Sequence, residues 1–168
     1  EVILQEIAAT QDSPEEIAYE LLSNIAYPEQ PIGRAILGTP ETVSRFNAVD
    51  LRNFLRTHYH PQQMVLSAAG RIDHAQLVDL ARQHFNHFES GPLSIAPIAR
   101  YVGGAIASEK PFEQAHLLMG FRSASYRSPD FVVAQVFSGL FGGGMSSRLF
   151  QEVREKLGLC YSIYSSSW

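Results

Sequence analysis

The sequence predicts an α+β protein in two parts, and three observations lead to this expectation. Apolar residues recur at helical spacing behind capping residues, and short apolar runs typical of strands lie between these segments. Between the two parts the periodicity stops in a stretch rich in turn residues. The 168 residues suffice for one domain or for two incomplete ones joined by a linker. We expect a first part over residues 1–89, a linker over 90–100 and a second part over 101–168.

Helices should dominate the first part. Ser13 and Glu16 have the spacing of a capping box, with a proline at the first helical position between them, and an apolar stripe at four-residue spacing follows. Asn47 and Asp50 repeat the capping pattern, and Asp73 is a further N-cap candidate. The first three expected helices cover residues 1–11, about 13 residues from Pro14 and a short stretch from Pro40. The fourth lies between Asn47 and Pro61 and the fifth follows Asp73. The inner face of the fourth should carry Leu51, Phe54, Leu55 and His58.

Four apolar runs are predicted to be strands, and two more helices are predicted between the third and the fourth of these runs. The strands are Met64–Ala69, Tyr101–Ser108, Glu113–Phe121 and Leu159–Trp168. The helices cover Pro129–Leu140 and a segment with Leu149, Val153 and Leu157 in register. Gly158 should end the second of these helices, because glycine is favoured just after a helix C-terminus.

The composition is that of a folded protein without a nucleic-acid or membrane role. The chain is 45% hydrophobic and 18% charged, with a net charge of −4, which argues against disorder and against a basic patch for phosphate backbones. No apolar run is long enough to span a bilayer. The single cysteine, Cys160, excludes an internal disulfide and slightly favours a reducing compartment such as the cytoplasm or the mitochondrial matrix. A start without Met and an end within a strand-like run suggest an internal fragment.

No spacing of the six histidines matches a zinc peptidase motif. His-Glu-x-x-His and its inverted form His-x-x-Glu-His are both absent, so each histidine is interpreted as a helix-surface or core-edge residue. Cys160 has no histidine or other base near it in the sequence, which argues against a catalytic thiol. The residues therefore predict no catalytic residue within the chain.

The glycine run Gly142, Gly143 and Gly144 is not a phosphate loop. It follows a helix rather than a strand and lacks the Walker lysine. Three glycines allow unusual backbone angles and close approaches, which suits a loop that a peptide can pass, although a purely structural turn between helices explains them as well.

Residues 141–161 resemble the second-domain signature of the pitrilysin-type metallopeptidases, the insulinase and mitochondrial-processing-peptidase family M16. The matching sequence is FGGGMSSRLFQEVREKLGLCY. Other blocks resemble the family in the same order: EVILQEI at 1–7, PIGRAILGT at 31–39, HYHP at 58–61 and EQAH at 113–116. The resemblance covers essentially the whole chain. It implies two-layer sheet-and-helix domains of the processing-peptidase type, here the later part of a first, metal-binding domain and the early part of a second.

The resemblance also implies roles for particular residues. Glu6 is similar to the family's glutamate ligand for zinc, while the His-x-x-Glu-His segment would lie before Glu1. Arg154 and Tyr161 resemble the arginine and tyrosine that the second domain contributes to the substrate cleft. A phenol can donate to a developing oxyanion, and a guanidinium can bind a peptide carbonyl. Together with the glycines 142–144, this pair is expected to bind substrate.

The resemblance implies that the parent protein is a zinc endopeptidase that acts on peptides or unfolded polypeptides. This chain is then expected to be an inactive fragment of it that binds no zinc. The first alternative is a non-catalytic homologue that serves as a partner or scaffold subunit. The second is a small-molecule-binding α/β domain, for which the sequence names no ligand. The family implies single two-domain chains, homodimers or heterodimers with a related subunit, and the residues favour none of these.

Overall fold

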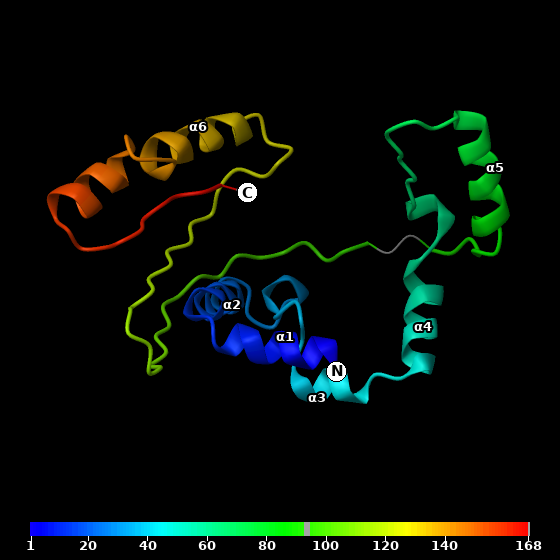
Figure 1. Ribbon diagram of the computed structural model, residues 1–168, viewed down its shortest axis with the longest axis horizontal. Coiled ribbons are helices and arrows are strands. Elements are labelled where there is room, and N and C mark those ends of the chain that lie inside the picture. Colours follow the sequence, from blue (N-terminus) through cyan, green and yellow to red (C-terminus); the bar gives the residue numbers. More distant parts are fainter. Residues whose placement is uncertain (93–94, 168) are drawn as a thin grey trace. The chain divides into compact units, whose positions relative to one another are not determined.

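The computed structural model describes residues 1–92 and 95–167, and every regular element within them is helical (Figure 1). The chain divides into two compact units, Glu1–Leu118 and Met119–Trp168. The predicted linker includes residues 93 and 94, which lie outside the described residues, so the predicted domain boundary stays a prediction. None of the described helices is long and apolar enough to cross a membrane.

The predicted helices are confirmed, with ends that shift by a few residues. The first unit contains α1 (Val2–Gln11), α2 (Pro14–Ala26), α3 (Pro40–Arg45), α4 (Ala48–His58) and α5 (His74–Phe85), with the 3₁₀ turns η1 (Pro31–Gly33) and η2 (Pro61–Gln63). The second unit contains α6 (Phe131–Gly142) and the π-helix η3 (Phe150–Lys156). In the first unit α1 lies against α2 and α3, and α2 against η1.

The helices begin where the capping residues are. The Asn47 side chain accepts the backbone N–H groups of Val49 and Asp50 at 2.8 and 3.3 Å, while the Asp50 carboxylate accepts the N–H of Asn47 at 3.0 Å. Asp73 accepts the N–H of Gln76 at 2.9 Å at the start of α5. Each such cap satisfies N–H groups that the helix itself leaves unpaired, which stabilises the helix by about 1 kcal/mol.

The predicted sheet-and-helix layers are wrong for the part of the chain that the structure describes. The four strand-like runs, 64–69, 101–108, 113–121 and 159–167, contain no strand there, and residue 168 lies outside the described part. Val65 is 93% exposed and Phe121 is 79% exposed, so these apolar side chains pack on no second layer. The physical reason is that an apolar β-favouring run specifies an extended backbone, whereas a strand also needs a partner that takes up its hydrogen bonds.

Little apolar surface is buried in the described residues. Ile7 on α1 and Ala26 at the end of α2 are the buried hydrophobic residues there, and these two helices lie against each other. The expected inner face of α4 is open to solvent. Leu51, Phe54 and Leu55 are 59%, 56% and 44% exposed, and His58 is exposed too. The helical period identified this apolar face, but it could not show whether another element covers it.

A side-chain clamp joins the end of α2 to a segment 70 residues later. The Gln30 carboxamide donates from Nε2 to the Arg100 carbonyl at 2.8 Å and accepts the Arg100 N–H at its Oε1 at 2.7 Å. Its two atoms thus bind the main chain of Arg100 as a neighbouring strand would. Two residues on, the Val102 N–H donates to the Ala26 carbonyl at 2.8 Å. This carbonyl belongs to the last residue of α2, which lacks a helical partner.

Close contacts continue along α2 beyond the clamp. Tyr101 packs its ring edge-on against Tyr27, with 6.0 Å between ring centroids. Gly104 lies so near α2 that a Cβ there would come within 2.9 Å of the Ile25 side chain, and its φ of +150° favours glycine as well. Residues 100–104 therefore run back along α2 from its C-terminal end (Figure 1).

We predict that Gln30→Ala in the full-length protein loosens this segment. Loss of the two carboxamide bonds, each contributing about 1 kcal/mol, should accelerate amide hydrogen exchange at Arg100 and Val102 by about five- to thirtyfold. Hydrogen exchange followed by mass spectrometry measures this, and Gln83→Ala, an exposed glutamine of α5, is the matched control. Unchanged exchange over residues 100–102 would contradict the clamp.

Candidate functional site

The candidate site is built on the π-helix η3, whose backbone turn is wider than that of an α-helix. The Leu157 N–H donates to the Glu152 carbonyl five residues earlier, at 3.2 Å. On the surface of this helix Lys156 Nζ donates to the Glu152 carboxylate at 2.7 Å. This hydrogen bond, with the positive charge of Lys156, lowers the pKa of the Glu152 carboxyl. Short π-helical segments occur frequently at functional sites.

The chain reverses direction directly after η3. Gly158 has a φ of +62°, a left-handed conformation that glycine adopts without a steric penalty, as predicted for the end of this helix. Its N–H donates to the Arg154 carbonyl, and the Leu159 N–H donates to the Val153 carbonyl, both at 3.1 Å. The next residues therefore pass back beside the helix, which brings Tyr161 to Arg154.

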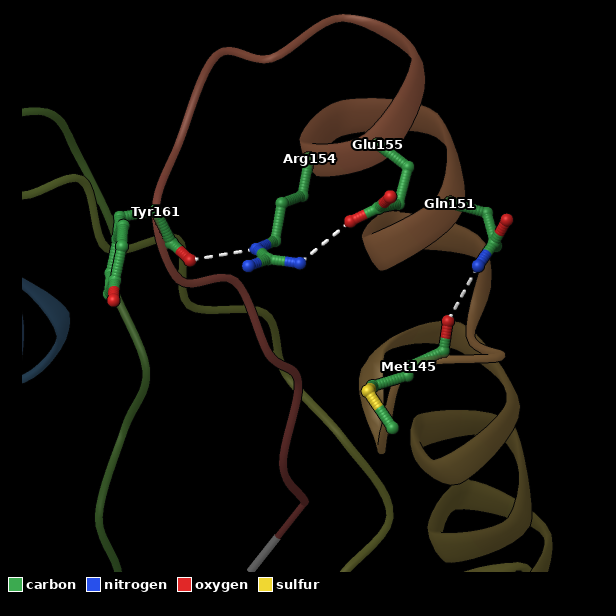
Figure 2. Close-up of polar contacts among 5 residues, drawn as sticks. All are labelled: Met145, Gln151, Arg154, Glu155 and Tyr161. Atoms are coloured by element: carbon green, nitrogen blue, oxygen red, sulfur yellow. Dashed lines mark hydrogen bonds and ion pairs between the residues drawn. The ribbon is translucent and has the colours of Figure 1, made fainter.

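Arg154 is held by three contacts, and Figure 2 shows the two that are hydrogen bonds. Its Nε–H donates to the main-chain carbonyl of Tyr161 at 2.9 Å, and its Nη1 donates to the Glu155 carboxylate at 2.6 Å. The guanidinium also lies over the Phe150 ring, 4.6 Å from the ring centroid. A planar guanidinium can lay its face on a ring while it donates from fixed directions in its plane, whereas an ammonium has no face to stack.

The Tyr161 side chain is open to solvent. It is 88% exposed, and its phenol extends away from the Arg154 guanidinium (Figure 2). The structure places Arg154 and Tyr161 next to each other and joins them through the backbone of Tyr161. Glu155 and Phe150, which orient Arg154, were not identified from the sequence. Phe150 could have been found from its spacing, four residues before Arg154 on the helix, whereas Glu155, the adjacent residue, gave no such signal.

Of the three glycines, Gly142 and Gly143 have no room for a Cβ, since one at Gly143 would come within 2.7 Å of the Gly139 carbonyl oxygen, and Gly142 packs on a segment distant in sequence. Gly142 is buried, and a Cβ there would come within 2.5 Å of the Cβ and the backbone nitrogen of Ser165. The Ser165 N–H donates to the Gly142 carbonyl at 3.1 Å, and its hydroxyl lies 2.9 Å from the hydroxyl of Ser138. Nothing lies within 4 Å of a Cβ placed at Gly144. Ser138 and Ser165 were not predicted from the sequence. A serine within the apolar stretch of α6 was the available signal for Ser138, which the structure shows to be buried.

The glycine loop is also tied to η3. Gln151 Nε2 donates to the main-chain carbonyl of Met145 at 2.7 Å, directly after the glycines (Figure 2). The Gly142, Arg154 and Tyr161 positions therefore belong to one hydrogen-bonded structure in the second unit. A role in substrate binding stays a prediction for all of them.

Glu6 lies on the solvent face of α1, whose buried side carries Ile7 and Thr10. Glu6 is exposed to solvent. No group of three metal-binding side chains exists in the described part of the chain. A catalytic zinc needs three protein ligands, so the residues present do not fit a complete zinc site.

His60 has a structural role that the sequence did not specify. It is 5% exposed, and its Nδ1 and Nε2 lie 3.1 and 3.0 Å from the carbonyl oxygens of Glu89 and Thr57. Gly91 lies against the same ring, which leaves no space for a Cβ. The imidazole thus joins the end of α4 to the residues after α5, in line with a core-edge rather than a metal-binding interpretation.

Comparison with known proteins gives a consistent family. The family described as the peptidase M16 inactive domain matches residues 45–167. An uncharacterized zinc protease of Rickettsia bellii is 42% identical over 166 residues, which are 98% of this chain and 40% of that protein. One of Rickettsia felis is 40% identical over 171 residues, which are 100% of this chain and 42% of that protein. The chain thus spans about two fifths of the length of these relatives.

A solved structure shares the fold. The crystal structure of a peptidase M16 inactive domain from Pseudomonas fluorescens matches with a TM-score of 0.69 and 22% sequence identity. The match covers 96% of this chain and 40% of that one.

The packing at Gly142 predicts that Gly142 and Gly144 differ in their tolerance of a side chain. Gly142→Ala should displace Ser165 from α6, because the added Cβ has no room, and lower the free energy of unfolding by about 1 to 3 kcal/mol. Gly144→Ala, at an open position, should change it by less than about 0.5 kcal/mol. Denaturant unfolding of the full-length protein measures both. Equal effects of the two substitutions would show that the contact with Ser165 does not constrain Gly142.

Proposed function

This chain belongs to the peptidase M16 family, and from that premise we propose that it is the substrate-binding part of a zinc-dependent endopeptidase that cleaves peptides or unfolded polypeptides. One observation carries the proposal. The matched residues 45–167 include Arg154 and Tyr161, and at this place the chain presents an exposed phenol on a backbone that the Arg154 guanidinium binds. The relatives named zinc proteases support the protease class.

The chemistry proposed for this chain is the binding of a peptide carbonyl. The hydroxyl of Tyr161 can donate a hydrogen bond to a carbonyl oxygen that gains negative charge during hydrolysis. Its exposure lets a peptide reach it without rearrangement of the second unit. The glycine loop beside η3 gives a peptide backbone close access, since two of its glycines, Gly143 and Gly144, are exposed.

In this proposal the metal site is completed by residues outside the chain. Glu6 supplies one carboxylate, and two further ligands come from elsewhere in the full-length protein. Zinc would supply the activation of the attacking water when it is bound. No catalytic residue is assigned within these 168 residues, and the isolated chain is expected to be inactive. The single Cys160 is compatible with a reducing compartment.

A second candidate function is a non-catalytic subunit that binds a peptide or a related partner chain. The observation that favours it is the family description itself, since the matched domain is called inactive. Both candidates use the surface around Tyr161, but they differ in whether the full-length protein hydrolyses bound peptide. A peptide-cleavage assay of the full-length protein with and without a chelator separates them.

Tyr161→Phe tests the endopeptidase proposal. This substitution removes one hydroxyl donor from an exposed side chain, so the fold should be unchanged while kcat/KM for peptide hydrolysis falls by about ten- to a thousandfold. Tyr126→Phe, which removes the hydroxyl of another exposed tyrosine in the second unit, is the matched control. Unaltered kinetics in Tyr161→Phe would rule out the donor role.

Glu6→Gln tests the metal role. A neutral amide is a poorer zinc ligand than a carboxylate, so zinc content and peptide hydrolysis of the full-length protein should fall together, by tenfold or more, roughly the loss seen when a metal site is perturbed. Glu15→Gln on α2 is the control, and elemental analysis after dialysis gives the zinc content. The isolated chain should hold no stoichiometric zinc. Full zinc retention in Glu6→Gln would refute the ligand role.

A further inference from the structure

We propose that His60 is a pH-sensitive contact, whose charged imidazole holds the residues after α5 to the end of α4 and whose neutral form loosens them. The ring is 5% exposed and lies in the first unit, apart from the residues to which the proposed function assigns a role. Its two hydrogen bonds carry the inference, because both are made to groups that can only accept.

The first hydrogen bond replaces one that the sequence removes from the end of α4. The Thr57 carbonyl lies four residues before Pro61, and a proline has no N–H to continue the helical pattern to it. His60 Nε2 lies 3.0 Å from this oxygen and supplies the donor instead. A positive charge on the ring is favoured here, since a helix C-terminus is the negative end of the helix dipole.

The second hydrogen bond joins the ring to the chain that follows α5. His60 Nδ1 lies 3.1 Å from the Glu89 carbonyl oxygen, so each ring nitrogen faces an acceptor and has to donate. An imidazolium has an N–H on both nitrogens, whereas a neutral imidazole has one and turns a lone pair towards the other oxygen. The charged ring therefore binds both segments, and the neutral ring binds only one of them.

Burial decides how much the missing donor matters. Gly91 lies against Cε1, the ring atom between the two nitrogens, and leaves no space there for a Cβ. Burial disfavours the charge, whereas two hydrogen bonds from a charged donor and the helix end favour it. A buried carbonyl that loses its donor destabilises the contact. Loss of the proton as the pH rises should thus free residues 89–91, where the predicted linker begins.

The titratable side chains around the ring do not take over this charge. His58 packs on Phe54, with 4.6 Å between ring centroids. His87 packs on Phe88 at 4.4 Å, and Glu89 meets the imidazole through its main-chain carbonyl. The other titratable groups of these segments are Arg56, Tyr59 and His84, while η2 contributes none. Within the described residues the ring forms no ion pair, so its own proton is the charge that changes.

Limited proteolysis of the full-length protein tests the contact. A glutamate-specific endoprotease cuts after Glu89, whose carbonyl binds the ring, and after the exposed Glu109, which serves as the internal reference. Cleavage follows the population of the open form. From about pH 5 to about pH 8, the range in which imidazoles lose their proton, cleavage after Glu89 relative to Glu109 should rise about three- to tenfold, as expected for the loss of one hydrogen bond.

His60→Gln removes the titration but keeps one donor. In this variant the cleavage ratio should be the same at both pH values and at least as high as the wild-type ratio at the alkaline one. His58→Gln, at the same helix end and exposed, is the matched control and should keep the wild-type pH dependence. The proposal is wrong if the wild-type ratio does not change with pH, or if His60→Gln retains the change.

Nuclear magnetic resonance of the wild-type protein gives an answer even if His60→Gln fails to fold. In the full-length protein labelled with ¹⁵N-histidine, the contact of the Cε1 proton with Gly91 identifies the His60 ring. The ring should show two N–H groups at about pH 5 and one at about pH 8. The same number of ring N–H groups at both pH values would overturn the proposal.

Discussion

The reversal of the chain at Gly158 is the constraint on which the candidate site depends. A left-handed residue at this point redirects the backbone onto the helix that it has just left. Only then can Tyr161 reach the guanidinium of Arg154 seven residues earlier, and only then is the phenol placed at the surface. The wider turn of η3 contributes to the same result, because its N–H bonds reach one residue further back than those of an α-helix.

The helices could be predicted from the sequence because their determinants are local. Asn47 and Asp50 lie three residues apart and bind each other's backbone, so the start of α4 needs no information from elsewhere in the chain. The same holds for Asp73 and α5. The strand predictions failed because pairing is not local. Val65 and Phe121 favour an extended backbone, but nothing in their own segments says whether a partner strand lies beside them.

The candidate site was foreseen in part. Arg154, Tyr161 and the glycines were singled out by resemblance to a family, which gives identities but no geometry. The structure adds the residues that hold them: Phe150 under the guanidinium, Glu155 beside it and Ser165 against Gly142. These neighbours have ordinary side chains whose importance comes from their place in the fold. A metal site is a different case, since Glu6 by itself carries no pattern that distinguishes a ligand from a surface glutamate.

The clamp on Arg100 determines which amino-acid substitutions positions 30 and 100 can tolerate. The Gln30 carboxamide binds only the N–H and the carbonyl of that residue, groups that nearly every amino acid possesses. Position 100 can therefore accept many side chains without loss of the clamp, and proline, which lacks the N–H, is the one residue chemically barred from it. The selective constraint falls instead on Gln30, where asparagine would be too short by one methylene and glutamate would lose the donor. The side chain at position 100 can therefore vary while its backbone stays fixed, because the residue that fixes it, Gln30, lies 70 positions away in the sequence.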